Sequence, residues 1–279
     1  MEVNPLLTNL KRQHAESPSR PTETPTRSHS PRNRKILESL VPVAPIVPRH
    51  RWYLPCKAAV EFTLALILFG LSVPLILAAA LVVKLTSRGP AFYTQTRVGR
   101  NGRLFAIYKI RTMVHDCESL TGPRWSMPGD PRITRMGHFL RVTHTDELPQ
   151  LFNVLRGDMS IIGPRPERPE FLPKLERVIP LYRDRLAVRP GITGLAQVNL
   201  GADTDVENVR KKLAYDLHYV RHVSPWLDVR ILTATLFYIL RNPYKVAQKM
   251  SLVPHGETVE RTMKAVALEE MAGRERKCA

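Results

Sequence analysis

An uncharged run of 22 residues, 62–83, constrains the fold of this chain more than any other feature of its sequence. Such a run is long enough to cross a bilayer as one helix. Two observations argue against a simple span. Pro74 falls inside the run, where it removes a backbone hydrogen bond and bends a helix. Lys and Arg residues also flank both ends of the run, against the positive-inside tendency of membrane proteins.

A re-entrant helix would satisfy both observations, because it enters the membrane, breaks and returns to the same face. We therefore expect such a helix over residues 51–85, with the membrane break at Ser72 and Pro74. A single transmembrane helix is the alternative.

The two ends of the chain are expected to be extensions of a central domain. Residues 1–50 are basic and rich in proline, which is typical of disordered segments. They form either a dispensable tail or a basic arm that touches the anionic face of a membrane. The apolar run comes too late for a secretory signal. Residues 242–279 contain no recognisable functional motif and are expected to be the second extension. The catalytic domain is therefore expected at 86–241.

The charge balance indicates the class of partner. The chain has 279 residues, with 42 Lys and Arg against 25 Asp and Glu, a net charge of +17. Such a balance favours nucleic acid, phospholipid headgroups or phosphorylated substrates, and composition does not choose among them. Its three cysteines show no metal-type spacing, which favours a reduced, cytosol-facing environment.

Residues 145–157 combine a helix start with two adjacent acids. Thr145 is expected to cap a helix whose first turn holds Asp146 and Glu147, and Gly157 is expected to end it. On one interpretation the acids merely suit the positive end of the helix dipole. On the other they form a carboxylate pair for chemistry on a phosphate.

The segment that follows supports the second interpretation. Residues 159–162 are expected to form a short buried strand, and this strand leads into a loop in which two prolines restrain Arg165. Carboxylates alone repel a phosphate, so the chemistry requires a divalent cation, nearby arginines, or both.

Other segments suggest a small mixed domain. Strands are expected at 91–94 and 105–110, and alternation would direct Lys109 and Arg111 together at an anion. A helix over 133–143 would present Arg141. Amphipathic helices are expected at 211–220 and 224–241. We expect an α/β or α+β fold, a small membrane-embedded catalytic domain with a re-entrant N-terminal helix, short strands and amphipathic surface helices.

Three segments together resemble the signature of the bacterial sugar transferase family, the monotopic phosphoglycosyl transferases. They are Asp-Glu-Leu-Pro-Gln-Leu at 146–151, Gly-Asp-Met-Ser at 157–160 and Gly-Pro-Arg-Pro-Glu at 163–167. Tyr-Lys-Ile-Arg-Thr-Met at 108–113 and Arg-Pro-Gly-Ile-Thr-Gly-Leu-Ala-Gln-Val-Asn at 189–199 are also similar. The resemblance extends over about residues 57–241.

The chain departs from the family pattern in two places. Where the family has a Ser-Pro break in its membrane helix, this chain has Val73-Pro74, with Ser72 one position earlier. In the family a glycine follows the asparagine that corresponds to Asn199, whereas here Leu200 intervenes before Gly201.

The resemblance implies transfer of a sugar-1-phosphate from a UDP-sugar to polyprenyl (undecaprenyl) phosphate, with release of UMP. Asp146 would attack the β-phosphate and carry an aspartyl phosphosugar intermediate, and Glu147 would help to bind Mg²⁺. Asp146 and Glu147 are therefore the expected catalytic and metal-binding residues. The expected substrate-binding residues are Lys109, Arg111, Arg141, Arg165, Glu170, Arg189 and Gln197.

The resemblance also implies a setting. The enzyme would catalyse the first membrane step of exopolysaccharide or glycoconjugate synthesis at the bacterial inner (cytoplasmic) membrane, with its active site facing the cytoplasm. Its partners would be UDP-sugar, polyprenyl phosphate, membrane lipid and other polysaccharide-assembly enzymes, but no nucleic acid. Two other functions are compatible with parts of the sequence. One is a metal-dependent glycosyltransferase that moves the sugar alone and releases UDP. The other is a basic membrane-anchored binding protein, which would not explain the Asp146-Glu147 pair.

Overall fold

The computed structural model describes residues 50, 52–119, 122, 124–127, 129–200, 206–239 and 259. Apart from His50 and Val259, the two predicted extensions, 1–50 and 242–279, lie outside the described residues.

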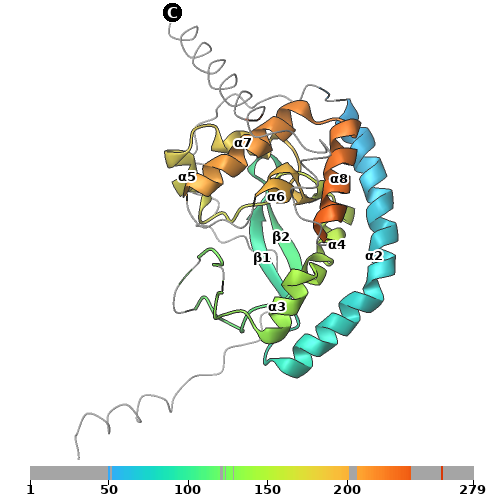
Figure 1. Ribbon diagram of the computed structural model, residues 1–279, viewed down its shortest axis with the longest axis vertical. Helices are drawn as coiled ribbons and strands as arrows, with labels where there is room; N and C mark the ends of the chain where they lie inside the picture. The colour runs from blue at the N-terminus through green and yellow to red at the C-terminus, as the bar shows by residue number, and fades with distance from the viewer. Residues whose placement is uncertain are drawn as a thin grey trace, which may run out of the picture.

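The longest element is α2 (Tyr53–Thr86), a helix of 34 residues that curves along one side of the molecule (Figure 1). It is the one helix in the described part of the chain that is long and apolar enough to cross a membrane. The helix continues through Pro74, so the expected break is absent and α2 is one curved helix (Figure 1). Near Pro74 the Ser72 hydroxyl donates to the Phe69 carbonyl at 3.0 Å. Pro74 has no amide hydrogen, so the Gly70 carbonyl lacks its helical hydrogen-bond partner. The Ser72 hydroxyl does not replace that partner, because it binds the Phe69 carbonyl.

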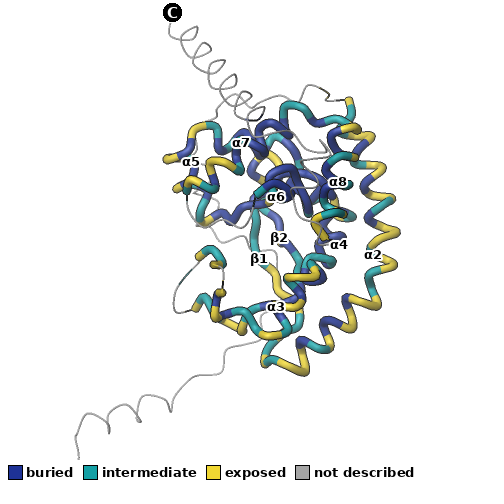
Figure 2. The backbone as a smooth tube through the Cα atoms, in the orientation of Figure 1, coloured by how far each residue is buried: buried dark blue, intermediate teal, exposed yellow. Residues whose placement is uncertain are grey.

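Both ends of α2 pack against the same domain. At its beginning, Lys57 reaches Asp228 of α8. At its end, Val83 packs with Ile110 and Leu140. Figure 2 shows the outward side of the helix mostly exposed and the elements behind it mostly buried. The exposed outer residues are apolar and include Phe62, Leu66, Ile67, Leu71, Leu75 and Leu81. This face is the surface on which lipid contact would occur.

The strands form two small pairs. β1 (Phe92–Val98) and β2 (Leu104–Ile110) are antiparallel, with Tyr93 opposite Lys109. This hairpin confirms the two predicted strands, although β1 is longer than expected. β3 (Ser160–Ile162) confirms the predicted buried strand and pairs in parallel with β4 (Gly191–Thr193). A Cβ on Gly191 would collide with the backbone of Gly163, so a side chain at 191 would obstruct this approach.

Helices surround these strands. The short ones are α3 (Arg135–Val142), α4 (Gln150–Leu155), α5 (Leu172–Val178) and α6 (Leu195–Asn199). The longer ones are α7 (Val206–His222) and α8 (Pro225–Ile239). They confirm the helices expected near 133–143, 211–220 and 224–241, with α7 beginning earlier than expected. The hydroxyl of Ser224 accepts from the Leu227 amide at 3.4 Å at the start of α8.

The main hydrophobic core lies where α2, α4, β3, α6, α7 and α8 meet, with fully buried residues such as Leu195, Tyr219 and Ile231. A second cluster lies between α5 and α7, and a third between α2, β2 and α3. The fold is thus the predicted mixed domain of helices and short strands against one apolar helix.

Candidate active site

The turn that carries the two adjacent acids differs from the predicted helix. Residues Thr145–Glu147 form a single 3-10 turn, and α4 begins only at Gln150. Two features keep the 3-10 turn from forming one continuous helix with α3 and α4. His144 has a left-handed backbone with φ of 55°, and Pro149 lacks the amide that a continuous helix would use. Thr145 bonds the Thr143 hydroxyl at 2.8 Å rather than capping a helix. Gly157, with φ of 76°, ends the segment as predicted.

Glu147 is held by two cations from different elements. Lys109 of β2 places its Nζ 2.6 Å from Glu147 Oε1, and Arg165 of the proline-flanked loop places a guanidinium nitrogen 2.6 Å from the same oxygen. Burial by itself would raise the pKa of Glu147. The positive charges of Arg165 and Lys109 outweigh burial, so the pKa lies well below its usual range. Glu147 is therefore ionised and serves as the anchor of both cations.

Asp146 has the opposite environment. It is 6% exposed, and among the described residues none donates a hydrogen bond to its carboxylate. Burial and then the negative charge of Glu147 raise its pKa to about 6, against the opposing charges of Lys109, Arg141 and Arg165. At neutral pH Asp146 is therefore mostly ionised, and it is more basic than an exposed aspartate. A buried carboxylate of this kind is equipped to act as a nucleophile or a base.

The structure brings five of the predicted residues together. Lys109, Arg165, Asp146 and Glu147 form one cluster, which we call the Asp146 cluster. Arg141 of α3 adjoins it, because its charge lowers the pKa of Asp146. The Arg141 guanidinium donates to the hydroxyls of Thr112 and Ser126, each at 2.9 Å.

Arg111 does not join Lys109, contrary to the expectation that both would point at one anion. Its guanidinium donates to the carbonyls of Ser87 and Arg88 and to the Ser87 hydroxyl, just beyond the end of α2. Arg111 lies one residue past the end of β2, and there its side chain holds the segment that follows α2. Its predicted role in substrate binding rests on the sequence alone.

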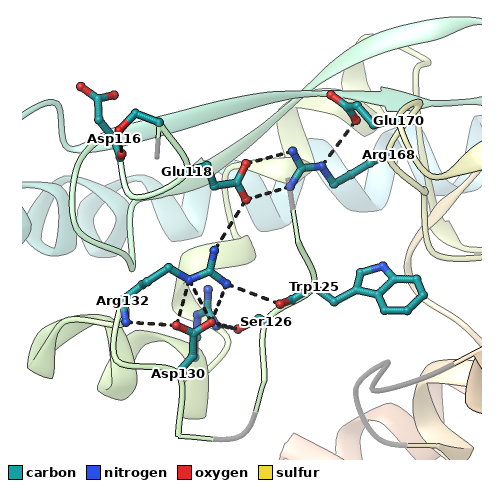
Figure 3. Close-up of polar contacts among 10 residues, drawn as sticks. Asp116, Glu118, Trp125, Ser126, Asp130, Arg132, Arg168 and Glu170 are labelled. Atoms are coloured by element: carbon teal, nitrogen blue, oxygen red, sulfur yellow. Dashed lines mark hydrogen bonds and ion pairs between the residues drawn. The ribbon is translucent and has the colours of Figure 1, made fainter. Parts of the chain in front are cut away.

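Glu170 belongs to a polar network beside the cluster (Figure 3). In this network Glu118 binds Arg168 through both its oxygens, at 2.8 and 2.9 Å, and also faces Arg132. Arg132 in turn binds Asp130 at 2.6 Å. Glu170 lies at the margin, 3.5 Å from Arg168 and 40% exposed. The network fastens the loop that contains Glu118 to the segment before α5.

Gln197 and Arg189 lie in a different part of the domain. The Gln197 amide donates to the Ile192 carbonyl at 2.8 Å, while its side-chain oxygen is buried without a hydrogen-bond partner among the described residues. Arg189 lines two cavities that it shares with Arg100. In the described part of the chain, no side-chain hydrogen bond or ion pair joins either residue to Asp146 or Glu147. Their roles in substrate binding stay predictions.

A second buried polar cluster was missed from the sequence. Lys57 of α2 binds Glu61 at 2.7 Å and Asp228 of α8 at 2.8 Å. Asp228 also accepts from the hydroxyls of Tyr53 and Tyr219, each at 2.8 Å. We call these five residues the Lys57 cluster. Its sequence signal is the charge pair at i,i+4 spacing just before the uncharged run. The partner at 228 is too distant in sequence to be identified from that pattern.

Asp146 and Glu147 are the carboxylates predicted to hold Mg²⁺. Within the described ranges no group of three or more His, Cys, Asp or Glu side chains is placed to hold a metal. Mg²⁺ is commonly bound by one or two protein carboxylates together with substrate phosphates and water. Asp146 and Glu147 therefore fit such a partial set, with Asp146 the more available because Glu147 already binds Lys109 and Arg165.

Comparisons with known proteins give a consistent result. The family model described as bacterial sugar transferase matches residues 52–242. A UDP-N-acetylgalactosamine-undecaprenyl-phosphate N-acetylgalactosaminephosphotransferase of Aeromonas hydrophila is 45% identical over 184 residues, which cover 66% of this chain and 43% of the relative. A UDP-glucose:undecaprenyl-phosphate glucose-1-phosphate transferase of Xanthomonas campestris pv. campestris is 45% identical over 198 residues, 70% of this chain and 40% of the relative.

A shorter relative is matched over more of its own length. The exopolysaccharide production protein PSS of Rhizobium leguminosarum bv. phaseoli is 43% identical over 168 residues, 58% of this chain and 84% of the relative. The chain thus spans less than half of the two longer relatives and most of this one.

Proposed function

Because the chain belongs to the bacterial sugar transferase family, we propose that it transfers a sugar-1-phosphate from a UDP-sugar to polyprenyl (undecaprenyl) phosphate. The names of the longer relatives describe this type of reaction. One observation supports it most strongly. Asp146 is a buried carboxylate with a raised pKa and no hydrogen-bond donor in the described structure, and it stands beside two cations anchored by Glu147.

The chemistry would proceed in two displacements at one phosphorus. In the first, a carboxylate oxygen of Asp146 attacks the β-phosphorus of the UDP-sugar. The bond between that phosphorus and the bridging oxygen breaks, and UMP leaves with the electron pair. In the second, an oxygen of the polyprenyl phosphate attacks the same phosphorus and the Asp146 carboxylate departs. The soluble donor and the lipid acceptor then need not be bound simultaneously.

The surrounding residues would prepare the site for anionic substrates. Glu147 fixes Lys109 and Arg165 within hydrogen-bonding distance of one oxygen, so both cations are already oriented when a diphosphate arrives. Arg165 presents a planar guanidinium, which matches the geometry of phosphate oxygens. Arg141 adds positive charge from the side of α3. Mg²⁺, held by Asp146 and Glu147 together with substrate phosphates, would offset further negative charge.

The position of α2 supports a re-entrant topology. Its two ends contact one domain through Lys57 and Val83, while its outer face is apolar and exposed. A helix that crossed the membrane would place its ends on opposite sides, where a single polar domain could not contact both. We infer that α2 lies in one leaflet of the inner membrane, with the Asp146 cluster on the cytoplasmic side.

Cysteine labelling tests this topology. His50→Cys and Pro90→Cys would each be introduced after the native cysteines are replaced by serine. Neither should react with an impermeant maleimide in intact spheroplasts, and both should react once the membrane is permeabilised. Labelling of residue 50 from outside, with residue 90 protected, would refute re-entry.

The reaction itself is tested by its products. The full chain would be incubated with a panel of UDP-sugars, Mg²⁺ and undecaprenyl phosphate, and UMP and UDP would be separated. UMP is expected, whereas release of UDP would indicate transfer of the sugar alone. Without lipid acceptor, the intact mass should rise by one sugar phosphate. Peptide mapping should place the adduct on Asp146, and an adduct elsewhere would end the covalent-aspartate proposal.

The biological setting is part of the same proposal. The name of the Rhizobium relative refers to exopolysaccharide production. We therefore place the reaction at the first membrane step of exopolysaccharide or glycoconjugate synthesis, where later polysaccharide-assembly enzymes would use the lipid-linked sugar.

A further inference from the structure

Two adjoining cavities lie beside the beginning of α2 and outside the Asp146 cluster. The first has a volume of about 300 Å³ and the second about 250 Å³. They share Arg100 and Arg189 as lining residues, so the two cavities meet at these side chains. Sites for small ligands begin at roughly 300 Å³. No member of the Asp146 cluster lines either cavity.

The second cavity is strongly cationic. Arg100 and Arg103 come from the turn between β1 and β2, and Arg189 comes from the segment before β4. Within the described structure, the side chains of these three arginines have no hydrogen-bond or ion-pair partner. The acid in the lining, Asp158, is already paired with Arg156 at 3.2 Å. The cavity therefore offers uncompensated guanidinium groups, which bind phosphate oxygens well.

The first cavity supplies an apolar wall next to these arginines. Leu54, Pro55 and Ala58 of α2 line it, together with Val188 and Val223. Its charged residues, Lys57 and Glu61, already bind each other at 2.7 Å. A ligand that fills both cavities would therefore carry an anionic group on one side and a hydrocarbon group on the other.

Two exposed indoles mark this end of the molecule. The beginnings of α2 and α8 lie side by side, as the 2.8 Å contact between Lys57 and Asp228 requires (Figure 1). Trp52, just before α2, is 66% exposed, and Trp226, in the first turn of α8, is 70% exposed. Exposed tryptophans are enriched at the headgroup level of membranes. The cavity residue Val223 lies two residues before the start of α8, so the cavities adjoin this region.

We propose that the joined cavities bind one anionic membrane phospholipid. Its phosphate lies among Arg100, Arg103 and Arg189, and its glycerol and first methylenes lie against the apolar wall of α2. The site is independent of the sugar-phosphate chemistry, because it uses none of the Asp146 cluster.

Polyprenyl phosphate has the same general chemistry, a phosphate on a hydrocarbon chain, but it fits this position less well. An acceptor must bring its phosphate to the reacting group. Along β2, Arg103 and Lys109 are six residues apart, or about 20 Å at roughly 3.3 Å per residue. That separation is no obstacle to a phospholipid, which does not react.

Calorimetric titration of the full chain in neutral detergent tests the proposal. Water-soluble dihexanoylphosphatidylglycerol should bind saturably to one site. The triple variant Arg100→Gln, Arg103→Gln, Arg189→Gln should bind it about a hundredfold more weakly, since each basic residue near an anionic lipid contributes about fivefold. A matched control removes the same charge from remote exposed positions: Lys174→Gln, Arg177→Gln, Lys211→Gln. The control should bind within about twofold of the unaltered chain. Equal affinity of both triple variants would overturn the proposal.

Further ligands distinguish the sources of the phosphate. Dihexanoylphosphatidylcholine and inorganic phosphate should each bind much more weakly than phosphatidylglycerol. Ala58→Phe fills the apolar cavity, so it should weaken binding of phosphatidylglycerol and leave that of inorganic phosphate unchanged. If inorganic phosphate bound as tightly as the lipid, the site would be one for free phosphate. If geranyl phosphate bound there and phosphatidylglycerol did not, the ligand would be a polyprenyl phosphate. Either result would refute the phospholipid assignment.

Discussion

The Lys57 cluster and the Asp146 cluster bury similar charges but differ in how those charges are satisfied. In the Lys57 cluster, both oxygens of Asp228 accept hydrogen bonds, and so do both oxygens of Glu61, from Ser160 and other donors. In the Asp146 cluster, Glu147 is equally well satisfied, whereas Asp146 receives no hydrogen bond from any described residue. Burial of charge is therefore common to both clusters. The carboxylate left without a donor is what distinguishes the proposed reactive centre from the Lys57 cluster.

The substitution Asp146→Asn is expected to have the largest effect on activity. This change keeps the size of the side chain but removes the anionic oxygen, so UMP release should fall by at least about a thousandfold. Because the Asp146 carboxylate accepts no hydrogen bond from the described residues and its ionisation opposes folding, thermal stability at neutral pH should not fall and should rise modestly. The measurements are UMP release and thermal unfolding in detergent. Substantial UMP release by this variant would show that Asp146 is not the reactive group, so the two clusters would not differ in the proposed way.

Asp228→Asn should show the reverse behaviour. The amide cannot accept from Lys57 and both tyrosines together, and it leaves a buried ammonium without its second carboxylate. The loss should be about 3–5 kcal/mol, seen as a decrease in Tm of about 10 °C. Asp158→Asn is the matched control, because its partner Arg156 is exposed and such pairs contribute less than about 1 kcal/mol. A stable Asp228→Asn protein would show that the Lys57 cluster is not structural.

Arg165→Lys tests the geometry of the Asp146 cluster while keeping its charge. A lysine can bind Glu147 through one contact, but it cannot offer a planar pair of donors to a phosphate. UMP release should fall by about tenfold or more, with stability retained. Lys174→Arg, an exposed change between the same two residue types, should leave activity intact. Normal turnover in Arg165→Lys would remove this side chain from the phosphate site.

The pH dependence should follow Asp146. The reactive form is the carboxylate, so activity should fall as pH decreases through about 6, the raised pKa of Asp146. Glu147→Gln removes the neighbouring negative charge, so the acidic limb should move to lower pH by about one unit even though overall turnover falls. The kcat/KM for UMP release would be measured from pH 5 to 8, values chosen to bracket that pKa. An unmoved limb would exclude Asp146 as the titrating group.

The raised pKa of Asp146 also affects stability. As pH rises, activity should increase, whereas the contribution of Asp146 to stability should decrease. Because the folded pKa of Asp146 is raised above its unfolded value of about 3.9, ionisation opposes folding. Its contribution to stability is fully present below the unfolded pKa and is lost as pH rises through about 6. Asp146→Asn should remove this dependence.

The smallest effect is expected for Glu170→Gln. Glu170 is 40% exposed and lies 3.5 Å from Arg168, which is already bound through two oxygens by Glu118. Activity and stability should both remain within about twofold and 0.5 kcal/mol of the unaltered protein. A large loss of UMP release with normal stability would instead support the predicted contact of Glu170 with substrate.

The strands and the longer helices could be predicted from local sequence pattern. The members of the Asp146 cluster could be predicted only with the resemblance to the family, because the local pattern alone left two interpretations of the acids open. The 3-10 turn at Thr145–Glu147 could not, since it depends on the left-handed backbone of His144 as well as on Pro149. Arg111 was misplaced because strand alternation holds only while the strand continues, and β2 ends at Ile110.

Side-chain contacts between residues that are distant in sequence also could not be predicted. The sequence marks Lys109 and Arg165 as phosphate-binding candidates, but it does not reveal that Glu147 holds both. Lys57 and Glu61 stand out as an i,i+4 pair, yet nothing local points to residue 228 or to Ser160. Tertiary packing alone brings these groups together.

The contact between Lys57 and Asp228 also has a consequence for biogenesis. The two residues are separated by 171 positions, so α2 leaves the ribosome long before its partner on α8 is made. At about 5–20 residues per second, the interval is on the order of 10–35 s. During that time the nascent helix can enter the lipid with only Glu61 to balance its lysine. The catalytic domain closes against α2 only when nearly all of it has been translated. On the proposed topology, membrane insertion thus comes first, and synthesis of α8 then provides the contact between the catalytic domain and α2.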